Sequence, residues 1–184
     1  VSLRANRSDA ERLLRDGHRL TYIDHHNAGP IPEHKNFISY IDTDPAVCTS
    51  VIVDQILGGK HRDWAITAAF GDNLIETAKK LAANTNLSSS QVGKLQELGE
   101  LLNYNGYGRK VEDLWFSPEK LFQKMKGYRS PFDFYVEAPE FLALRLHTFL
   151  INVPNFFPYI HSITLSNSKF LTRPFHISPS CKCF

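Results

Sequence analysis

Apolar and polar positions alternate in two short stretches near the start of the chain. Leu20 and Tyr22 lie at alternate positions ahead of Ile23, and a second apolar run spans residues 37–41. Alternation of this kind is typical of strands, so we expect strands over residues 18–23 and 37–41. Residues 27–34, rich in proline and glycine, should form the loop between them.

Helical spacing, with apolar residues three or four positions apart, characterises most of what remains. Ser8 and Glu11 form a potential capping box, in which each side chain bonds the other's amide, and this predicts a helix start. Ser117-Pro118 predicts another start, and Gly17 and Gly58-Gly59 predict helix ends. The expected helices cover residues 8–16, 49–57, 64–70, 74–83, 88–103, 117–125 and 139–149.

Strands and helices alternate in the first half of the chain, without a hairpin signal between the strands. This order predicts an α/β fold with a partial doubly wound, mostly parallel sheet, a helix-rich second half and an irregular C-terminal tail. The 184 residues have room for one domain of ordinary size plus a tail. We expect the domain at residues 1–150 and the tail at residues 151–184.

The end of the chain differs in composition from the rest. Residues 141–184 contain seven of the 13 phenylalanines, four basic residues and no acid, whereas residues 1–140 contain 17 Lys+Arg and 19 Asp+Glu. The basic balance therefore belongs to the tail and indicates no nucleic-acid-binding face on the body. Because disordered linkers are poor in phenylalanine, we interpret the tail as a non-native or mis-joined segment, such as a shifted reading frame. The alternative is a partner-binding segment.

Cysteine content and hydropathy bear on the cellular compartment in which the protein resides. Cys48, Cys181 and Cys183 are too few for a disulfide framework and lack the second ligand pair of a zinc site. No secretory signal opens the chain, and the apolar run at residues 141–153 is interrupted by charge and stopped by Pro154. We therefore expect a cytoplasmic protein without a membrane partner; the sequence does not indicate an oligomeric state.

The most distinctive chemistry follows the first predicted strand. Asp24, His25 and His26 stand there without a spacer. In open α/β sheets, ligands bind at the carboxyl ends of the strands. A carboxylate beside two imidazoles suits divalent ions such as manganese, zinc or iron. The alternative is a turn that is polar without a metal-binding role.

A second acid follows an apolar stretch. Asp72 comes after residues 65–70 and Gly71, and a carboxylate at the end of a buried element must be paired, hydrogen-bonded or metal-bound. The alternative is that Asp72 caps the helix expected at residues 74–83. The metal interpretation requires Asp72 and the Asp24–His26 stretch to converge on one pocket.

Together these stretches resemble the DHH phosphoesterase superfamily. Tyr22-Ile23-Asp24-His25-His26-Asn27 is similar to its third motif, and Ala68-Ala69-Phe70-Gly71-Asp72-Asn73 is similar to its fourth. The helix expected from Cys48-Thr49-Ser50 stands where the superfamily has a helix after its DHH strand. The resemblance covers roughly residues 1–85. The superfamily includes RecJ-type exonucleases, nano-RNA and cyclic-dinucleotide phosphodiesterases and family II pyrophosphatases.

The resemblance implies a metal-dependent phosphoesterase. Asp24, His25 and Asp72 would ligate manganese, or else magnesium or cobalt, and His26 would be catalytic, holding a phosphate oxygen or assisting the leaving group. Two such ions would lower the pKa of a shared water and clamp the phosphate. The substrate would be a nucleotide, a short nucleic acid or another phosphate ester.

Other parts of the superfamily pattern have no counterpart. Its first two motifs place strand-end aspartates upstream of the DHH strand, where this chain has 23 residues whose acids are Asp9, Glu11 and Asp16. The Gly-Gly-Gly-His signature of its second domain is also missing. We therefore expect an incomplete, N-terminally truncated fragment, which binds metal weakly and hydrolyses little. The alternative is a non-catalytic α/β remnant or interaction module.

Overall fold

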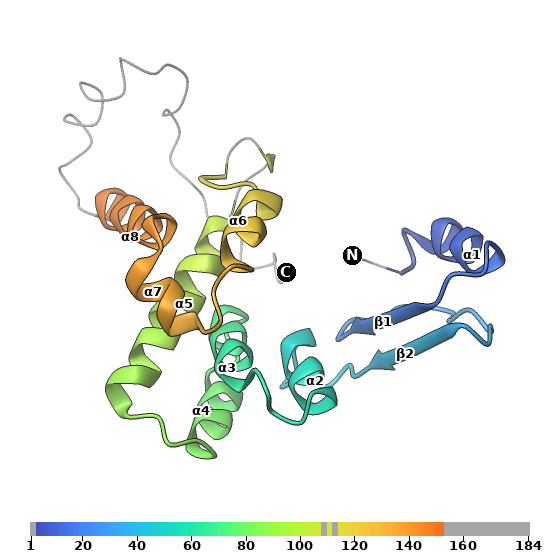
Figure 1. The fold of residues 1–184 in the computed structure, drawn as a ribbon, viewed down its shortest axis with the longest axis horizontal. Coiled ribbons are helices and arrows are strands. Elements are labelled where there is room, and N and C mark those ends of the chain that lie inside the picture. The colour runs from blue at the N-terminus through green and yellow to red at the C-terminus, as the bar shows by residue number, and fades with distance from the viewer. Residues whose placement is uncertain (1–2, 108–109, 112–113, 153–184) are drawn as a thin grey trace. The chain divides into compact units, whose positions relative to one another are not determined.

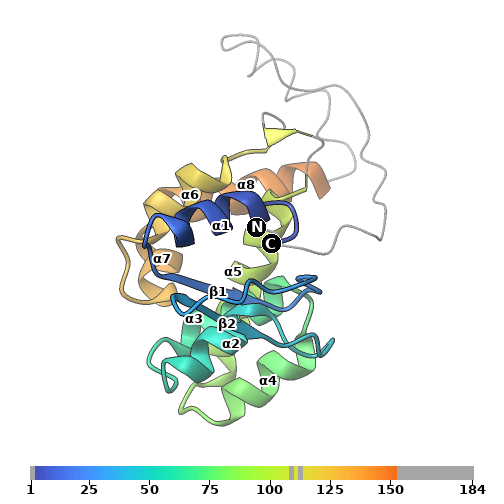
Figure 2. The ribbon, with the colours of Figure 1, turned by 90° about the vertical axis from the view of Figure 1, so that its right-hand side faces the viewer.

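Two parallel strands carry the candidate site. β1 (Leu20–Asp24) pairs with β2 (Phe37–Ile41), with Leu20 opposite Phe37 and Asp24 opposite Ile41. The computed structural model describes residues 3–107, 110–111 and 114–152, and the two strands lie side by side (Figures 1 and 2). The predicted α/β class and parallel pairing are confirmed. Since the described residues form no third strand, the doubly wound arrangement stays a prediction.

Helices make up most of the rest of the described chain. The seven that were predicted are present in the predicted order, and α7 (Pro131–Glu137) is an additional one. The chain divides into two compact units, Val1–Gly99 and Glu100–Phe184. The helices of the first unit are α1 (Arg7–Arg15), α2 (Thr49–Ile56), α3 (Arg62–Gly71), α4 (Ile75–Ala83) and the first part of α5 (Ser89–Asn105).

The core of the first unit lies where α3 meets α4 and α5. The side chains that fill it are fully buried, namely Ile66, Ala69, Phe70, Leu95 and Leu98. The α3 and α5 backbones approach so closely that a Cβ added to Gly99 would lie 2.2 Å from the Thr67 carbonyl oxygen. This contact fixes α3, whose last turn leads to Asp72.

The second unit contains the end of α5 together with α6 (Pro118–Met125), α7 (Pro131–Glu137) and α8 (Pro139–Asn152). Ser117 caps α6, as predicted, because its hydroxyl accepts a hydrogen bond from the Lys120 amide. Ser130 begins α7 with a complete capping box. Buried Phe134 lies edge-on to Tyr128.

The structure differs from the sequence prediction at the start of the first helix, and the last predicted segment lies beyond α8. The capping box expected at Ser8 is wrong: α1 begins at Arg7, Asn6 is its N-cap, and no side chain caps it. Glu11 instead accepts a hydrogen bond from Arg7 Nε at 2.7 Å, an i, i+4 pair on the same helix face. At the other end α8 continues to Asn152, and the predicted irregular tail beyond it lies outside the described residues.

Among the described residues, no helix has both the length and the apolar character that crossing a lipid bilayer requires.

Candidate metal centre

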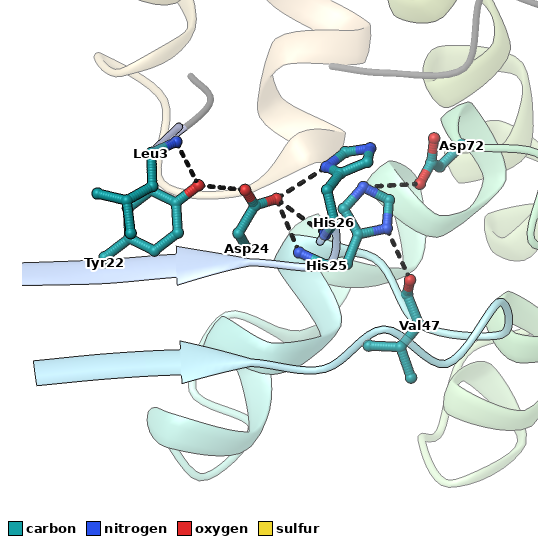
Figure 3. A network of polar contacts seen from close by, with 7 residues as sticks. All are labelled: Leu3, Tyr22, Asp24, His25, His26, Val47 and Asp72. Carbon is teal, nitrogen blue, oxygen red and sulfur yellow. Dashed lines mark hydrogen bonds and ion pairs between the residues drawn. The ribbon is translucent and has the colours of Figure 1, made fainter. Parts of the chain in front are cut away.

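The end of β1 places three polar side chains together. Asp24 is the last residue of the strand and is buried, and His25 and His26 follow it directly (Figure 3). One ligand atom from each of the three lies within 4.8 Å of the other two. The strand therefore delivers one carboxylate and two imidazoles to a single point, as the sequence predicted.

The Asp24 carboxylate is held by hydrogen bonds on both oxygens. Oδ1 accepts from the His25 amide at 2.8 Å, the His26 amide at 3.2 Å and His26 Nδ1 at 2.8 Å. Oδ2 accepts from the Tyr22 hydroxyl, which itself accepts from the Leu3 amide at 3.0 Å. One lone pair of Oδ2 therefore remains for a further partner.

These contacts set the ionisation of the Asp24 carboxyl group. Burial by itself would raise the pKa of Asp24, but the hydrogen bonds from Tyr22, from the His26 ring and from two backbone amides outweigh it and lower the pKa to about 2. Burial and the neighbouring carboxylate raise the pKa of the Tyr22 hydroxyl. Near neutral pH, Asp24 is therefore an anion and Tyr22 is its donor.

His25 is oriented by the loop that leads into α2. Its Nδ1 lies 2.9 Å from the Val47 carbonyl oxygen. Because a carbonyl only accepts, Nδ1 carries the proton, and the lone pair of the neutral ring is on Nε2. Metal-ligating histidines are typically fixed in this way, with one nitrogen bonded to a carbonyl and the other left for the metal.

Asp72 approaches that lone pair from another part of the chain. Its Oδ2 lies 3.9 Å from His25 Nε2 (Figure 3). Nε2 is buried and has no hydrogen-bond partner among the described residues. Two acceptors thus face each other, an arrangement that a shared cation, a proton on His25 or a bridging donor would satisfy. Metal–ligand bonds of about 2.1 Å place two ligands of one ion about 3–4 Å apart, so the spacing fits a metal.

The end of α3 explains how Asp72 reaches this place. Asp72 is the C-cap of α3, and Asn73 adopts a left-handed conformation with φ 60° that turns the chain into the next helix. The alternative that Asp72 caps the following helix is not observed, since the N-cap of α4 is Leu74. A helix C-terminus carries partial negative charge and favours a nearby cation, which adds to the effect of the carboxylate.

His26 is the most accessible member of the cluster. Its side chain is 43% exposed, against 12% for Asp24 and 15% for His25. Its Nδ1 donates to Asp24 Oδ1, which fixes the orientation of the ring. His25 and His26 lie edge to face, with ring centroids 4.0 Å apart.

Sequence reasoning missed several neighbours of the cluster. Tyr22 could have been found, because residues two apart on a strand share a face. The carbonyl of Val47 could not, since backbone groups leave no signature in sequence. Cys48 is buried beside it at the start of α2; burial raises the pKa of its thiol, and the charge of Asp72 raises it further. The thiol is therefore neutral in this setting.

Comparison of the chain with protein-family models, with curated proteins and with solved structures finds no match.

Proposed function

We propose that this chain carries a divalent-cation site of the kind used in phosphate-ester hydrolysis. The observation that supports the proposal best is the pair of facing acceptors, His25 Nε2 and Asp72 Oδ2, at 3.9 Å. The resemblance of the two contributing stretches to the third and fourth DHH motifs adds the reaction class. A doubly wound sheet, of which β1 and β2 would be one parallel pair, belongs to the same proposal.

The roles of the residues follow from their contacts. His25 and Asp72 would hold the cation, and Asp24 would join through the free lone pair of Oδ2; manganese is the first choice, with magnesium and cobalt as alternatives. When bound, such an ion acts as a Lewis acid toward phosphate and water. His26, accessible and backed by Asp24, is placed to hold a phosphate oxygen or to give a proton to a leaving alkoxide.

The first experiment is isothermal titration of the whole chain with Mn²⁺ at neutral pH. We expect binding, and we expect His25→Gln to weaken it at least about tenfold, since the variant removes the lone pair at the centre of the site. His18→Gln is the matched control, because His18 is exposed and lies outside the cluster. Equal affinities of wild type and His25→Gln would contradict the proposed site.

The second experiment separates binding from hydrolysis. Among the described residues, Asp24 and Asp72 are the carboxylates seen at the cluster, so we expect weak Mn²⁺ binding and slow hydrolysis of a chromogenic phosphodiester. His26→Gln should abolish that turnover while the Mn²⁺ affinity changes little. Turnover that is fast and survives His25→Gln would show that the chemistry occurs elsewhere in the protein.

A further inference from the structure

The outer edge of β2 is not used by the cation site. β2 is bonded to β1 on one side, and no described residue forms a strand on its other side. Parallel sheets are normally covered on both faces. An unpaired edge is a template for another strand.

The direction of the backbone groups alternates along β2. The Leu20 amide donates to the Asn36 carbonyl at 2.9 Å. The Asp42 amide donates to the Asp24 carbonyl at 3.2 Å. Even-numbered residues of the β2 stretch therefore face β1, as the parallel ladder requires. The backbone groups that face the open edge are those of Phe37, Ser39 and Ile41.

One face of the same strand is apolar and exposed. Ile38 is 53% exposed and Tyr40 is 41% exposed. The register places them beside Thr21 and Ile23 of β1, so they share one face of the sheet. An isoleucine and a tyrosine two residues apart form a small apolar surface at the margin of the sheet.

Charges of opposite sign flank the strand. Lys35 precedes it, and Asp42 and Asp44 follow it; all three residues are exposed. A second strand laid antiparallel, with the same sequence, would bring the basic end of each copy to the acidic end of the other. A parallel copy would instead place like charges together, which is unfavourable.

We propose that β2 is the interface of a homodimer in which two copies pair antiparallel about a twofold axis at Ser39. Residue 37 of one copy then faces residue 41 of the other, and the two Ser39 residues face each other. These are the residues whose backbone groups point outward, so the two Ser39 residues can exchange both bonds of an antiparallel pair, and each Ile41 amide can donate to the Phe37 carbonyl of the other copy. The Phe37 amide already donates to the His34 carbonyl at 2.9 Å and stays outside the ladder.

The same register matches the side chains. Ile38 of each copy meets Tyr40 of the other in a pair without mutual backbone bonds, in which side chains come closest. The two pairs lie on one face around the axis and cover each other's apolar surface. Lys35 faces Thr43, between the two aspartates of the partner. The interface is isologous, as twofold symmetry requires.

Sedimentation velocity on the whole chain from about 1 to 200 µM tests the association, a range suited to a small interface. We expect the mass to rise with concentration from the 21.0 kDa of one chain toward twice that value. Ser39→Pro should hold the protein at the monomer mass, because it removes an outward amide that β1 does not use and proline is tolerated at sheet edges. Its circular dichroism should match wild type.

Cross-linking tests the register even if Ser39→Pro fails to fold. Ile38→Cys and Tyr40→Cys are made as separate proteins in which Cys181 and Cys183 are serine; Cys48 is buried and stays. Mixed and oxidised, they should give the mixed disulfide in preference to either homodimeric one, since residue 38 faces residue 40.

Three results would overturn the proposal. The first is a chain that is monomeric over the whole range, which would leave the edge to a strand of another polypeptide. The second is a dimer that persists in well-folded Ser39→Pro. The third is a dimer that yields no mixed disulfide, which would place the interface elsewhere. The cation site takes no part in these experiments, so its failure would not affect them.

Discussion

At the scale of single residues, the cluster is a set of hydrogen bonds that converge on the Asp24 carboxylate. The Leu3 amide donates to the Tyr22 hydroxyl, and this hydroxyl donates to the Asp24 carboxylate. The same carboxylate accepts a hydrogen bond from His26 Nδ1. His25 stands beside this set of hydrogen bonds, oriented by a carbonyl, with its Nε2 lone pair directed at Asp72. The proton on each histidine ring is assigned to Nδ1, because the oxygen bonded to that nitrogen can only accept a hydrogen bond. These contacts fix the positions of the side chains that the proposed cation site would use.

The ionisation of Asp24 makes folding stability depend on pH. Its pKa is about 2, below the ordinary 3.8, so the folded state favours the carboxylate. The resulting stabilisation, about 2 kcal/mol at most, is fully present above pH 3.8 and is lost as the pH falls to about 2. Tyr22→Phe removes one of the hydrogen bonds that lower this pKa. We expect the acid-unfolding midpoint to move to higher pH and the free energy of unfolding at pH 7 to fall by about 1–2 kcal/mol.

Urea unfolding between pH 2 and pH 7, roughly the span over which acidic groups of folded proteins titrate, is the measurement. Tyr128→Phe serves as the control, because Tyr128 lies outside both the cluster and β2 and packs against Phe134 through its ring. If Tyr22→Phe and Tyr128→Phe had the same pH profile, the Tyr22 hydroxyl would not be what lowers the pKa of Asp24.

The residue scale also shows where sequence reasoning works and where it stops. The Asp24–His26 cluster was predictable because its members are contiguous and a strand end fixes their position. Asp72 was predictable only as one of two alternatives, because a capping carboxylate and a site carboxylate look the same in sequence. The orientation of His25 depends on the Val47 backbone oxygen, which no side-chain pattern encodes.

At the scale of elements, α2 and α3 form a helical hairpin that holds His25 at its open end. Val47 lies just before α2 and Asp72 lies just after α3, and both contact His25. At the closed end, Arg62 Nε donates to Asp54 Oδ2 at 3.2 Å, and the Asp54 side chain is only 2% exposed. This pair joins the two helices and so helps to set the separation of the Val47 oxygen and the Asp72 carboxylate.

Loss of the Arg62–Asp54 ion pair at the closed end of the hairpin should therefore also change the arrangement of the cluster at its open end. We expect Arg62→Met to cost about 2–4 kcal/mol of unfolding free energy, because Asp54 would be left buried and unpaired. The Mn²⁺ affinity measured by titration should also fall. Lys79→Met is the control: the Lys79–Glu76 pair is exposed and should contribute less than about 1 kcal/mol. Unchanged Mn²⁺ affinity in folded Arg62→Met would separate the hairpin from the site.

The contact between α3 and α5 supplies a second prediction at this scale. A methyl group on Gly99 would lie 2.2 Å from the Thr67 carbonyl oxygen, whereas one on Gly93, also in α5, would meet no atom within 4 Å. We expect Gly99→Ala to destabilise the protein by about 3 kcal/mol or more, since the obstacle is backbone. Gly93→Ala should raise stability by up to about 1 kcal/mol.

Thermal or urea unfolding of the two variants measures the difference directly. They carry the same substitution on the same helix, so the effect of helix propensity cancels when their stabilities are compared. The remaining difference in stability measures the close approach of the α3 and α5 backbones. Similar stabilities for Gly99→Ala and Gly93→Ala would mean that α5 moves away from α3 without cost. The approach itself was not predictable from the apolar stripe of α5, which identified the buried leucines but not the distance between backbones.

At the scale of the whole molecule, periodicity predicts the order of the elements but contains no information on how they group in space. The strand at residues 37–41 and the helices that follow it were found because each depends on local spacing. The division into units at Gly99 and Glu100 falls within α5, where no proline, glycine pair or change of composition indicates it. Grouping depends on contacts between residues distant in sequence, which a pattern along the chain does not contain.

This division leads to a prediction about the last part of the chain. Every contact described for the cluster is made by residues of the first unit, from Leu3 to Asp72. A chain ending at Asn152 should therefore bind Mn²⁺ within about twofold of the full-length affinity, as expected for a change without shared partners. Introducing His25→Gln into the shortened chain should weaken binding as much as it does in the full chain. If removal of residues 153–184 alone lowered the affinity tenfold, the Phe-rich basic tail would have to act on the site, because the contacts described for the cluster are made within residues 3–72.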